Sequence, residues 1–226
     1  MKIGIFTDTY YPQLNGVTIS IDNFVSTLER KGHEVYIFAP KVNKFHKKEK
    51  NIFRLSSLIV LSSEPEGLFP LYVPDETLQA IFRYDFDVIH AHGNGPFSIL
   101  GYQAAKIKRV PYILTFHTLH TEYAHYILDG KFIKPRMIAA GLKVSGNLCD
   151  GVITPSIKMQ EKLVSFGVTK PITIIPSFID TKKYSSLKKG YLHSLLHLPK
   201  ETPILLSVGR LGKEKNFEFV IKMFKK

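Results

Sequence analysis

The sequence has a single cysteine and no apolar run long enough to cross a membrane. One cysteine excludes an internal disulfide and is usual in the reducing cytoplasm. A membrane span needs about 20 consecutive apolar residues. At the amino terminus, Asp8 and Pro12 interrupt the apolar run, so we also expect no signal peptide. These absences favour a cytoplasmic protein.

Acidic residues are scarce relative to basic ones, with 19 Asp and Glu against 31 Lys and Arg and a formal charge of +12. Much of this excess lies after residue 181, and five lysines gather earlier in one short stretch: Lys41, Lys44, Lys47, Lys48 and Lys50. Such a run is either a solvated loop or a surface that attracts nucleotide phosphates or an acidic membrane. The sequence lacks zinc-finger spacing, helix-turn-helix patterns and aromatic RNA-binding signatures, so nucleic acid is not expected as a partner.

Short apolar runs alternate with helical patterns along the chain, which is typical of βαβ units and a parallel sheet. We therefore predict an α/β fold, with a Rossmann-like domain over residues 1–180. The expected strands are residues 2–7, 34–39, 52–55, 87–91, 111–116, 151–154 and 172–175. The expected helices begin near residues 17, 75, 96, 135 and 156.

Two regions depart from this alternation. Residues 56–74 carry several prolines and glycines and are expected to form a long loop, after which Asp75 caps a helix to about Phe82. Residues 181–202 resemble a linker. Residues 203–226 then contain a further apolar strand at 203–208 and the start of a helix. One strand and one helix cannot bury a core, so we expect this second domain to be incomplete in the chain.

Polar residues follow several of the expected strands, where ligands of parallel α/β sheets bind. The first strand leads into Asp8 and then into a loop ending at Asn15 and Gly16. A glycine at the start of a helix lets backbone N–H groups approach an anion, and the helix dipole adds attraction. Asn-Gly is also a routine turn, and the loop lacks the G-x-G-x-x-G spacing, which argues against NAD or FAD.

A second candidate site is the basic turn over residues 208–216, where Arg210 and Lys215 follow the 203–208 run. Two cations between a strand and a helix can hold a diphosphate and neutralise its charge as it leaves. The alternative is a solvated basic turn.

Histidines are frequent, and the pairs His90 with His92 and His117 with His120 have spacings that occur among metal ligands. We expect the side chains of His90 and His92 to point to opposite sides of their strand, and no carboxylate completes a site. We therefore predict no metal. His117, at a strand end, is better placed for a sugar or phosphate contact.

Seven segments together resemble a known family, the retaining glycosyltransferases of family four with the two-domain GT-B fold. They are DTYYPQLNGV (8–17), GHEVYIFAP (32–40), DVIHAHGNGPFS (87–98), TFHTLHTEYAHY (115–126), CDGVITPSIKM (149–159), IIPSFID (174–180) and SVGRLGKEKN (207–216). The first and fourth are most similar to bacterial diacylglycerol glucosyltransferases, which use UDP-glucose. The family's E-x7-E motif and uridine pocket are not found up to Lys226.

The resemblance implies a role for individual residues. His117 contacts the transferred sugar, and Arg210 and Lys215 grip the leaving diphosphate, so these three are the expected catalytic residues. Gly16, with Asn15 in place of the family's usual first glycine, places its N–H against the donor phosphates. Asp8 and Glu122 lie in matching segments and are candidates for the acceptor side. The nucleotide-sugar is a substrate, and no further cofactor is implied.

The resemblance also implies the reaction, in which a sugar, expected to be glucose from UDP-glucose, moves to a hydroxyl with retained anomeric configuration. Three hypotheses remain open: a lipid glucosyltransferase, a family member with a soluble or glycan acceptor, and a non-catalytic fragment that binds membranes. For a diacylglycerol acceptor, we expect peripheral binding to anionic lipid on the inner face of the membrane. The expected surface combines the lysines at 41–50 with a second group of basic and apolar residues: Lys131, Lys134, Arg136, Phe132, Ile133 and Met137. We expect the 226-residue chain to turn over UDP-glucose little or not at all.

Overall fold

The computed structural model describes residues 1–41, 50–60, 69–72, 77–119, 121, 134–179, 181, 189–209 and 215–224. The chain divides into two compact units, Met1–Phe178 and Ile179–Lys226. Each unit is described by itself. The predicted functional residues up to His117 belong to the first unit, and Lys215 belongs to the second.

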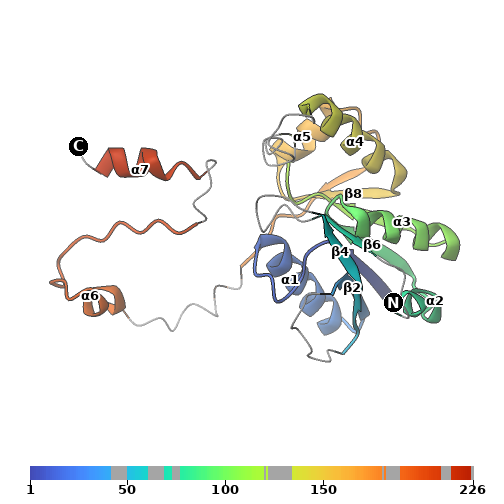
Figure 1. Cartoon of the computed structure of the whole chain (residues 1–226), viewed down its shortest axis with the longest axis horizontal. Helices are drawn as coiled ribbons and strands as arrows, with labels where there is room; N and C mark the ends of the chain where they lie inside the picture. The colour runs from blue at the N-terminus through green and yellow to red at the C-terminus, as the bar shows by residue number, and fades with distance from the viewer. Residues whose placement is uncertain are drawn as a thin grey trace. The chain divides into compact units, whose positions relative to one another are not determined.

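The first unit is built on a seven-stranded sheet in the order β3-β2-β1-β6-β7-β8-β9 (Figure 1). All six neighbouring pairs are parallel. The strands are β1 Lys2–Thr7, β2 Glu34–Pro40, β3 Ile52–Leu55, β6 Val88–His92, β7 Tyr112–Thr115, β8 Gly151–Thr154 and β9 Ile172–Ile174. The strand order reverses between β1 and β6, the place where doubly wound sheets bind ligands. This confirms the predicted Rossmann-like α/β fold.

Helices cover both faces of this sheet (Figure 1). The helices of the first unit are α1 Gly16–Arg30, α2 Leu78–Arg83, α3 Pro96–Lys108, α4 Pro135–Leu148 and α5 Ile157–Ser165. On one face, Ile21 of α1 is buried with Ile3 and Ile5 of β1. On the other, Phe97 of α3 packs in the larger core with Phe6. Successive strand residues face opposite sides, so β1 and β2 contribute to both cores.

The long loop expected over residues 56–74 is partly wrong. Strands β4 Ser57–Val60 and β5 Phe69–Tyr72 pair antiparallel as a separate two-stranded sheet. Pro70 lies within β5, and proline is tolerated in such a strand where its missing N–H faces away from the partner. The proline and glycine content therefore hid two short apolar strands, SLIV and FPLY.

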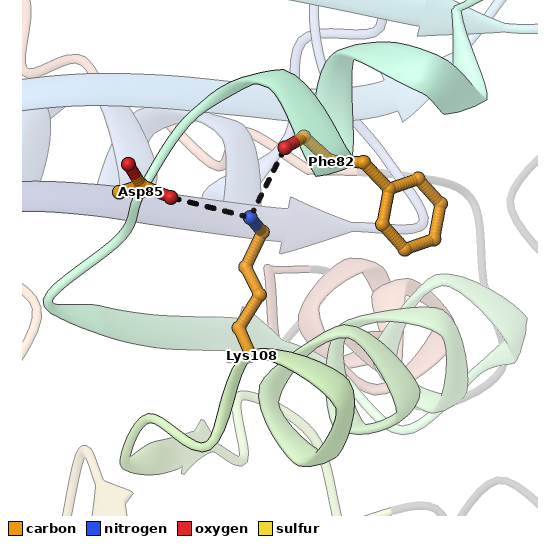
Figure 2. A network of polar contacts seen from close by, with 3 residues as sticks. All are labelled: Phe82, Asp85 and Lys108. Carbon is orange, nitrogen blue, oxygen red and sulfur yellow. Dashed lines mark hydrogen bonds and ion pairs between the residues drawn. The ribbon is translucent and has the colours of Figure 1, made fainter.

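Helix α2 begins later than expected. Its first residue is Leu78 with Thr77 at the N-cap position, and Asp75 lies outside the described residues. Figure 2 shows how the region after α2 meets the end of α3: the Lys108 ammonium donates to the carbonyl oxygen of Phe82 at 3.4 Å and lies 4.0 Å from the Asp85 carboxylate. The Asp85 side chain is fully exposed, so this ion pair adds little stability.

The second unit contains α6 Tyr191–Leu195 and α7 Phe217–Phe224, and none of its described residues is buried. The predicted buried strand at 203–208 is wrong: these residues pair with no strand in the described part of the chain. Leu205, Leu206 and Val208 are exposed. An extended segment becomes a strand only when another strand satisfies its backbone groups and covers its apolar side chains. The predicted domain boundaries at 180 and 202 stay a prediction.

Candidate active site

Asp8 follows β1 and caps the helix that follows β6. Its Oδ1 accepts a hydrogen bond from the N–H of Phe97 at 2.9 Å, and its Oδ2 accepts one from the N–H of Gly95 at 3.0 Å. Both oxygens therefore serve the amino terminus of α3, where free N–H groups and the helix dipole favour an anion. Burial raises the pKa of Asp8 to about 6, and the two backbone N–H groups oppose that rise. This geometry gives Asp8 a structural role, and its predicted acceptor contact stays a prediction.

Gly95 is required by this close approach. A β-carbon at position 95 would lie 2.5 Å from Oδ2 of Asp8. Contacts under about 3 Å force something to move, and here the obstacle is a short side chain held by two hydrogen bonds. The Asp8 carboxylate therefore occupies the amino terminus of α3, beside the switch point between β1 and β6.

The loop between Asp8 and α1 is held by its own side chains. The Asn15 amide donates to Thr9 Oγ1 at 2.9 Å, and Thr9 Oγ1 donates to Gln13 Oε1 at 2.8 Å. Thr18 Oγ1 donates to the carbonyl oxygen of Gln13 at 2.9 Å. Asn15 also caps α1, because its Oδ1 accepts from the N–H of Thr18 at 3.0 Å. Asn15 therefore fixes both the loop and the start of the helix.

Gly16 is the first residue of α1 and is exposed. A β-carbon built at this position would have no atom within 4 Å. The N–H groups of Gly16 and Val17 precede the capped N–H of Thr18, and a helix has no internal partner for its first amides. Packing therefore gives no reason for a glycine here, whereas access for a ligand to these N–H groups does.

Three histidines and a threonine form a buried polar cluster beside this loop. His90 and His92 lie on β6 with ring centroids 4.1 Å apart, so they share one side of the strand. The expectation that they point to opposite sides was wrong, because residues two apart on a strand face the same side. His90 Nε2 is 2.6 Å from Thr115 Oγ1, and His92 Nδ1 is 2.9 Å from His117 Nε2.

Burial keeps these histidines neutral. It lowers the pKa of His117 to about 4, and, with a smaller contribution from His117, that of His90 to about 3. The pKa of His92 is lowered well below its ordinary value by burial and by the two neighbouring rings. A neutral imidazole has one donor and one acceptor nitrogen. Near pH 7, His117 therefore offers a ligand a hydrogen bond and no charge.

His117 also lines an open pocket of about 300 Å³ at the carboxyl end of β7. The opposite wall is the start of α5, where the hydroxyl of Ser156 caps the helix by accepting from the N–H of Met159 at 3.3 Å. The pocket is lined by His117, Thr118, Leu119, Pro155, Ser156, Lys158 and Met159. Ser156 and Lys158 were not predicted as site residues, although both lie shortly after the carboxyl end of β8, where ligands of parallel sheets bind.

For the other residues predicted from the sequence, the described structure gives no contact with this pocket. Arg210 and Glu122 lie outside the described residues, as does His120. Lys215 is exposed just before α7, and a β-carbon on Gly209 would lie 3.8 Å from its Cγ. Across the described ranges, no group of three or more His, Cys, Asp or Glu residues is arranged to hold a metal ion. The diphosphate contacts of Arg210 and Lys215 stay predictions.

The chain is similar in sequence to glycosyltransferases. The model of Glycosyltransferase Family 4 matches residues 14–183. The alpha-monoglucosyldiacylglycerol synthases of Streptococcus pneumoniae and Acholeplasma laidlawii are 32% and 27% identical to the chain; each alignment covers 99% of the chain and respectively 52% and 59% of the relative. A GDP-mannose-dependent alpha-mannosyltransferase of Mycobacterium tuberculosis is 25% identical over 96% of the chain and 58% of its own length. The chain thus spans about half the length of the curated relatives it matches.

Among solved structures, a sucrose-phosphate synthase from Thermosynechococcus elongatus matches with a TM-score of 0.73 and 18% identity. That match covers 99% of the chain and 59% of the synthase, and at this identity it supports the fold. The family match includes Asn15 and Gly16 at the end of the loop, the histidine cluster and the pocket beside α5. It also confirms the family inferred from the seven sequence segments. On this basis the chain belongs to Glycosyltransferase Family 4.

Proposed function

We propose that the protein takes part in transferring glucose from UDP-glucose to diacylglycerol, with retention at the anomeric carbon. The glycosyltransferase assignment rests on the family match, and the choice of glucose and a diacylglycerol acceptor rests on the names of two relatives. The single observation in the structure that carries the proposal is the open first turn of α1 at Gly16.

The two helix amino termini at the switch point differ in what they can bind. The first amides of α3 are taken by the Asp8 carboxylate. In α1, Asn15 accepts from the N–H of Thr18, the helix has no internal partner for the N–H groups of Gly16 and Val17, and the space around the Gly16 α-carbon is open. An anionic diphosphate is therefore directed to α1. His117, as a neutral imidazole near pH 7, can contact a hydroxyl of the sugar without attracting the phosphates.

Catalysis in this arrangement depends on positioning and on charge. The acceptor hydroxyl attacks the anomeric carbon from the face that the diphosphate leaves, and an oxygen of the departing phosphate takes the proton. The first-turn amides of α1 stabilise the charge that grows on the leaving group. For Arg210 and Lys215, the same task is a separate prediction from the family resemblance. The buried histidines keep the site free of competing charge.

Substitution of Gly16 tests the donor site. In Gly16→Ala, the added methyl group meets no atom of the protein, so we expect the free energy of unfolding to change by less than about 0.5 kcal/mol. The same methyl group would stand between a phosphate and the first-turn amides, and we expect the Kd for UDP-glucose to rise roughly 10-fold, about 1.4 kcal/mol. Ligand-observed NMR with UDP-glucose, competed with GDP-mannose, measures both affinity and donor preference.

Gly141 on α4 provides the matched control, because a β-carbon there also meets no atom within 4 Å. Gly141→Ala should leave UDP-glucose affinity unchanged. Unchanged affinity in Gly16→Ala would remove the first turn of α1 from the donor site. Stronger binding of GDP-mannose than of UDP-glucose would favour a mannosyl donor, as in the mannosyltransferase relative.

The proposed lipid acceptor requires the protein to reach a bilayer, and α4 has a surface suited to one. Its outward residues Met137, Val144 and Leu148 are 55%, 59% and 45% exposed. Lys134 and Arg136 are exposed beside them, and the helix sequence has no acidic residue. Lys131, Phe132 and Ile133 lie outside the described residues, as do Lys44, Lys47 and Lys48. None of the described helices combines the length and apolarity that a membrane span demands.

We expect the protein to sediment with liposomes in proportion to their phosphatidylglycerol content. Each basic residue near an anionic surface contributes about 1 kcal/mol. Binding should weaken when the Debye length falls from ~10 Å at 0.1 M salt to ~3 Å at 1 M. Arg136→Glu on α4 should reduce binding, and Lys31→Glu at the end of α1 should not. Protein that stays in the supernatant at every lipid composition in low salt would contradict the membrane proposal.

An assay of glucose transfer to different acceptors tests the proposed acceptor. In a version of the protein that transfers sugar, diacylglycerol in mixed micelles should accept glucose and soluble sugars should not. Transfer to a soluble or glycan acceptor would replace the lipid proposal with the second hypothesis. Absence of transfer to any acceptor in every version would favour a non-catalytic binding role.

A further inference from the structure

The sheet contains four buried polar residues next to one another on its α1 side. Thr7 and Thr115 are the register partners of His92 on the two neighbouring strands, and all three are at most 3% exposed. His90 is 7% exposed one pleat earlier. Buried polar groups destabilise a core unless they are hydrogen-bonded. A cluster of this kind at the ligand-binding edge of the sheet therefore calls for a functional reason.

Each of these four residues has a hydrogen-bond partner, and His92 finds its partner outside the four, in His117. Thr7 is engaged with the backbone of Thr9, donating to its carbonyl oxygen at 2.8 Å. His90 is paired with Thr115 at 2.6 Å, and His92 with His117 at 2.9 Å. His117 is half-buried and reaches the pocket, so the His92–His117 pair connects the sheet interior to the site.

One ring nitrogen of His92, Nε2, has no hydrogen-bond partner among the described residues, and this decides which nitrogen carries the proton of the neutral ring. This nitrogen is buried. The rings of His90 and Phe24 lie beside the His92 ring, with centroids 4.1 Å and 5.6 Å away, and neither forms a hydrogen bond with Nε2. A proton on Nε2 would be an orphaned buried donor, and such donors are rarer than unsatisfied acceptors. The proton of neutral His92 therefore belongs on Nδ1.

This placement determines the tautomer of His117. A protonated Nδ1 of His92 donates to Nε2 of His117, 2.9 Å away. Nε2 of His117 is then the acceptor, and the single proton of the neutral ring must be on Nδ1. His92 thus selects one of two tautomers of His117, in the way that the second hydrogen bond of a functional histidine commonly does.

We propose that His92 is a positioning residue that holds His117 as its Nδ1–H tautomer, so that His117 presents an N–H donor to an oxygen of the sugar substrate. The contact with substrate rests on the proposed function, whereas the tautomer is a property of the chain alone. The hydrogen bond also fixes the plane of the His117 ring, since the two rings lie at 20° with centroids 5.1 Å apart.

The tautomer can be measured without substrate. In long-range ¹H–¹⁵N spectra of the 226-residue chain labelled on histidine, protonated and unprotonated ring nitrogens have well separated ¹⁵N shifts. We expect His117 to have a protonated Nδ1 and an unprotonated Nε2 at pH 7. The opposite pattern, with Nε2 of His117 protonated and donating to His92, would overturn the proposal whatever the protein's substrate is.

Variants separate the positioning role from packing. In His92→Leu, His117 loses its hydrogen-bond donor and should no longer hold the Nδ1–H tautomer. In His92→Asn, a side-chain amide lies near the former Nδ1 and should restore it. Thr115→Val removes the contact to His90 but not that to His117, so the His117 pattern should stay as in the wild type. A His117 tautomer unaffected by His92→Leu, or altered equally by Thr115→Val, would overturn the role of His92.

Kinetics provide the second readout. In a version that transfers sugar, His92→Leu should lower kcat by roughly 10- to 100-fold, as loss of an orienting partner does for other functional histidines, with a smaller change in KM. His92→Asn should recover most of that loss. Wild-type kcat in His92→Leu would overturn the positioning role while leaving the glycosyltransferase function intact, so the two failures are distinguishable.

Discussion

Replacing Arg210 or Lys215 by alanine should lower kcat for sugar transfer by roughly 100-fold or more. This is the usual effect of removing a preorganised charge contact to a group that becomes more negative in the transition state. The prediction rests on the basic sequence of residues 208–216, of which Lys215 is exposed just before α7. The measurement is the initial rate of transfer from UDP-glucose at saturating donor, in a version of the protein that is active.

Lys222 offers the matched control for the loss of one positive charge. It lies on α7 and is paired with Glu218 at 3.8 Å on the exposed surface, where ion pairs contribute little. Lys222→Ala should therefore keep the wild-type rate. If Arg210→Ala and Lys215→Ala also keep it, neither residue holds the diphosphate.

The second large effect is a loss of stability in acid. Burial lowers the pKa of His117 to about 4 and of His90 to about 3, and it places the pKa of His92 well below 6.5. The unfolded chain takes up protons at these rings below about pH 6.5, and the folded chain does not. The free energy of unfolding should therefore fall as pH drops from 6.5 towards 4, by up to roughly 1.4 kcal/mol per pH unit for each histidine.

Asp8 acts in the opposite direction. Its pKa is raised to about 6, so the folded chain binds a proton between pH 6 and 3.8 that the unfolded chain does not. This stabilises the fold at low pH and is lost as pH rises through 6. One such group offsets only part of the effect of three histidines, and the net slope should remain a loss in acid.

Urea unfolding at pH 7, 6, 5 and 4.5 measures this slope. In His90→Gln, one buried imidazole is gone and the side-chain amide lies near the former Nε2, within reach of the Thr115 hydroxyl, so the slope should be shallower. His197→Asn changes an exposed histidine of the second unit and serves as the control. Equal free energies of unfolding at pH 7 and 4.5 would contradict the buried neutral state of the cluster.

The alternation of elements in the first unit could be predicted from the sequence because hydrophobic period and turn chemistry agree there. For example, a helix was expected to begin near residue 156, and the Ser156 hydroxyl caps α5 there. The β4–β5 pair was not predicted because this region is rich in proline and glycine, and Pro70 lies within β5 itself. The 203–208 strand was predicted from apolar content alone, but strand formation depends on a neighbour that local sequence does not reveal.

The site was predictable in part, at the level of which residues follow which strands. His117 and Gly16 were selected as candidates by position; the structure places His117 at a pocket and Gly16 in open surroundings, and their ligand contacts stay predictions. The capping of α3 by Asp8 joins residues 87 and 89 positions apart, and no local pattern signals it. The His92–His117 pair likewise spans 25 residues and depends on strand register. Contacts between residues so far apart in the sequence depend on the strand order of the sheet, and motif spacing does not predict them.

The loop between β1 and α1 has a thermodynamic consequence for binding. A loop that becomes ordered only around its ligand loses backbone conformational entropy of about 1–2 kcal/mol per residue, and this loss weakens affinity. Here the Asn15–Thr9–Gln13 hydrogen bonds already order the loop, with Asp8 anchored at one end and Thr18 at the other. Most of that entropy is therefore lost during folding, and a phosphate that docks at Gly16 meets a loop with little conformational freedom left to lose.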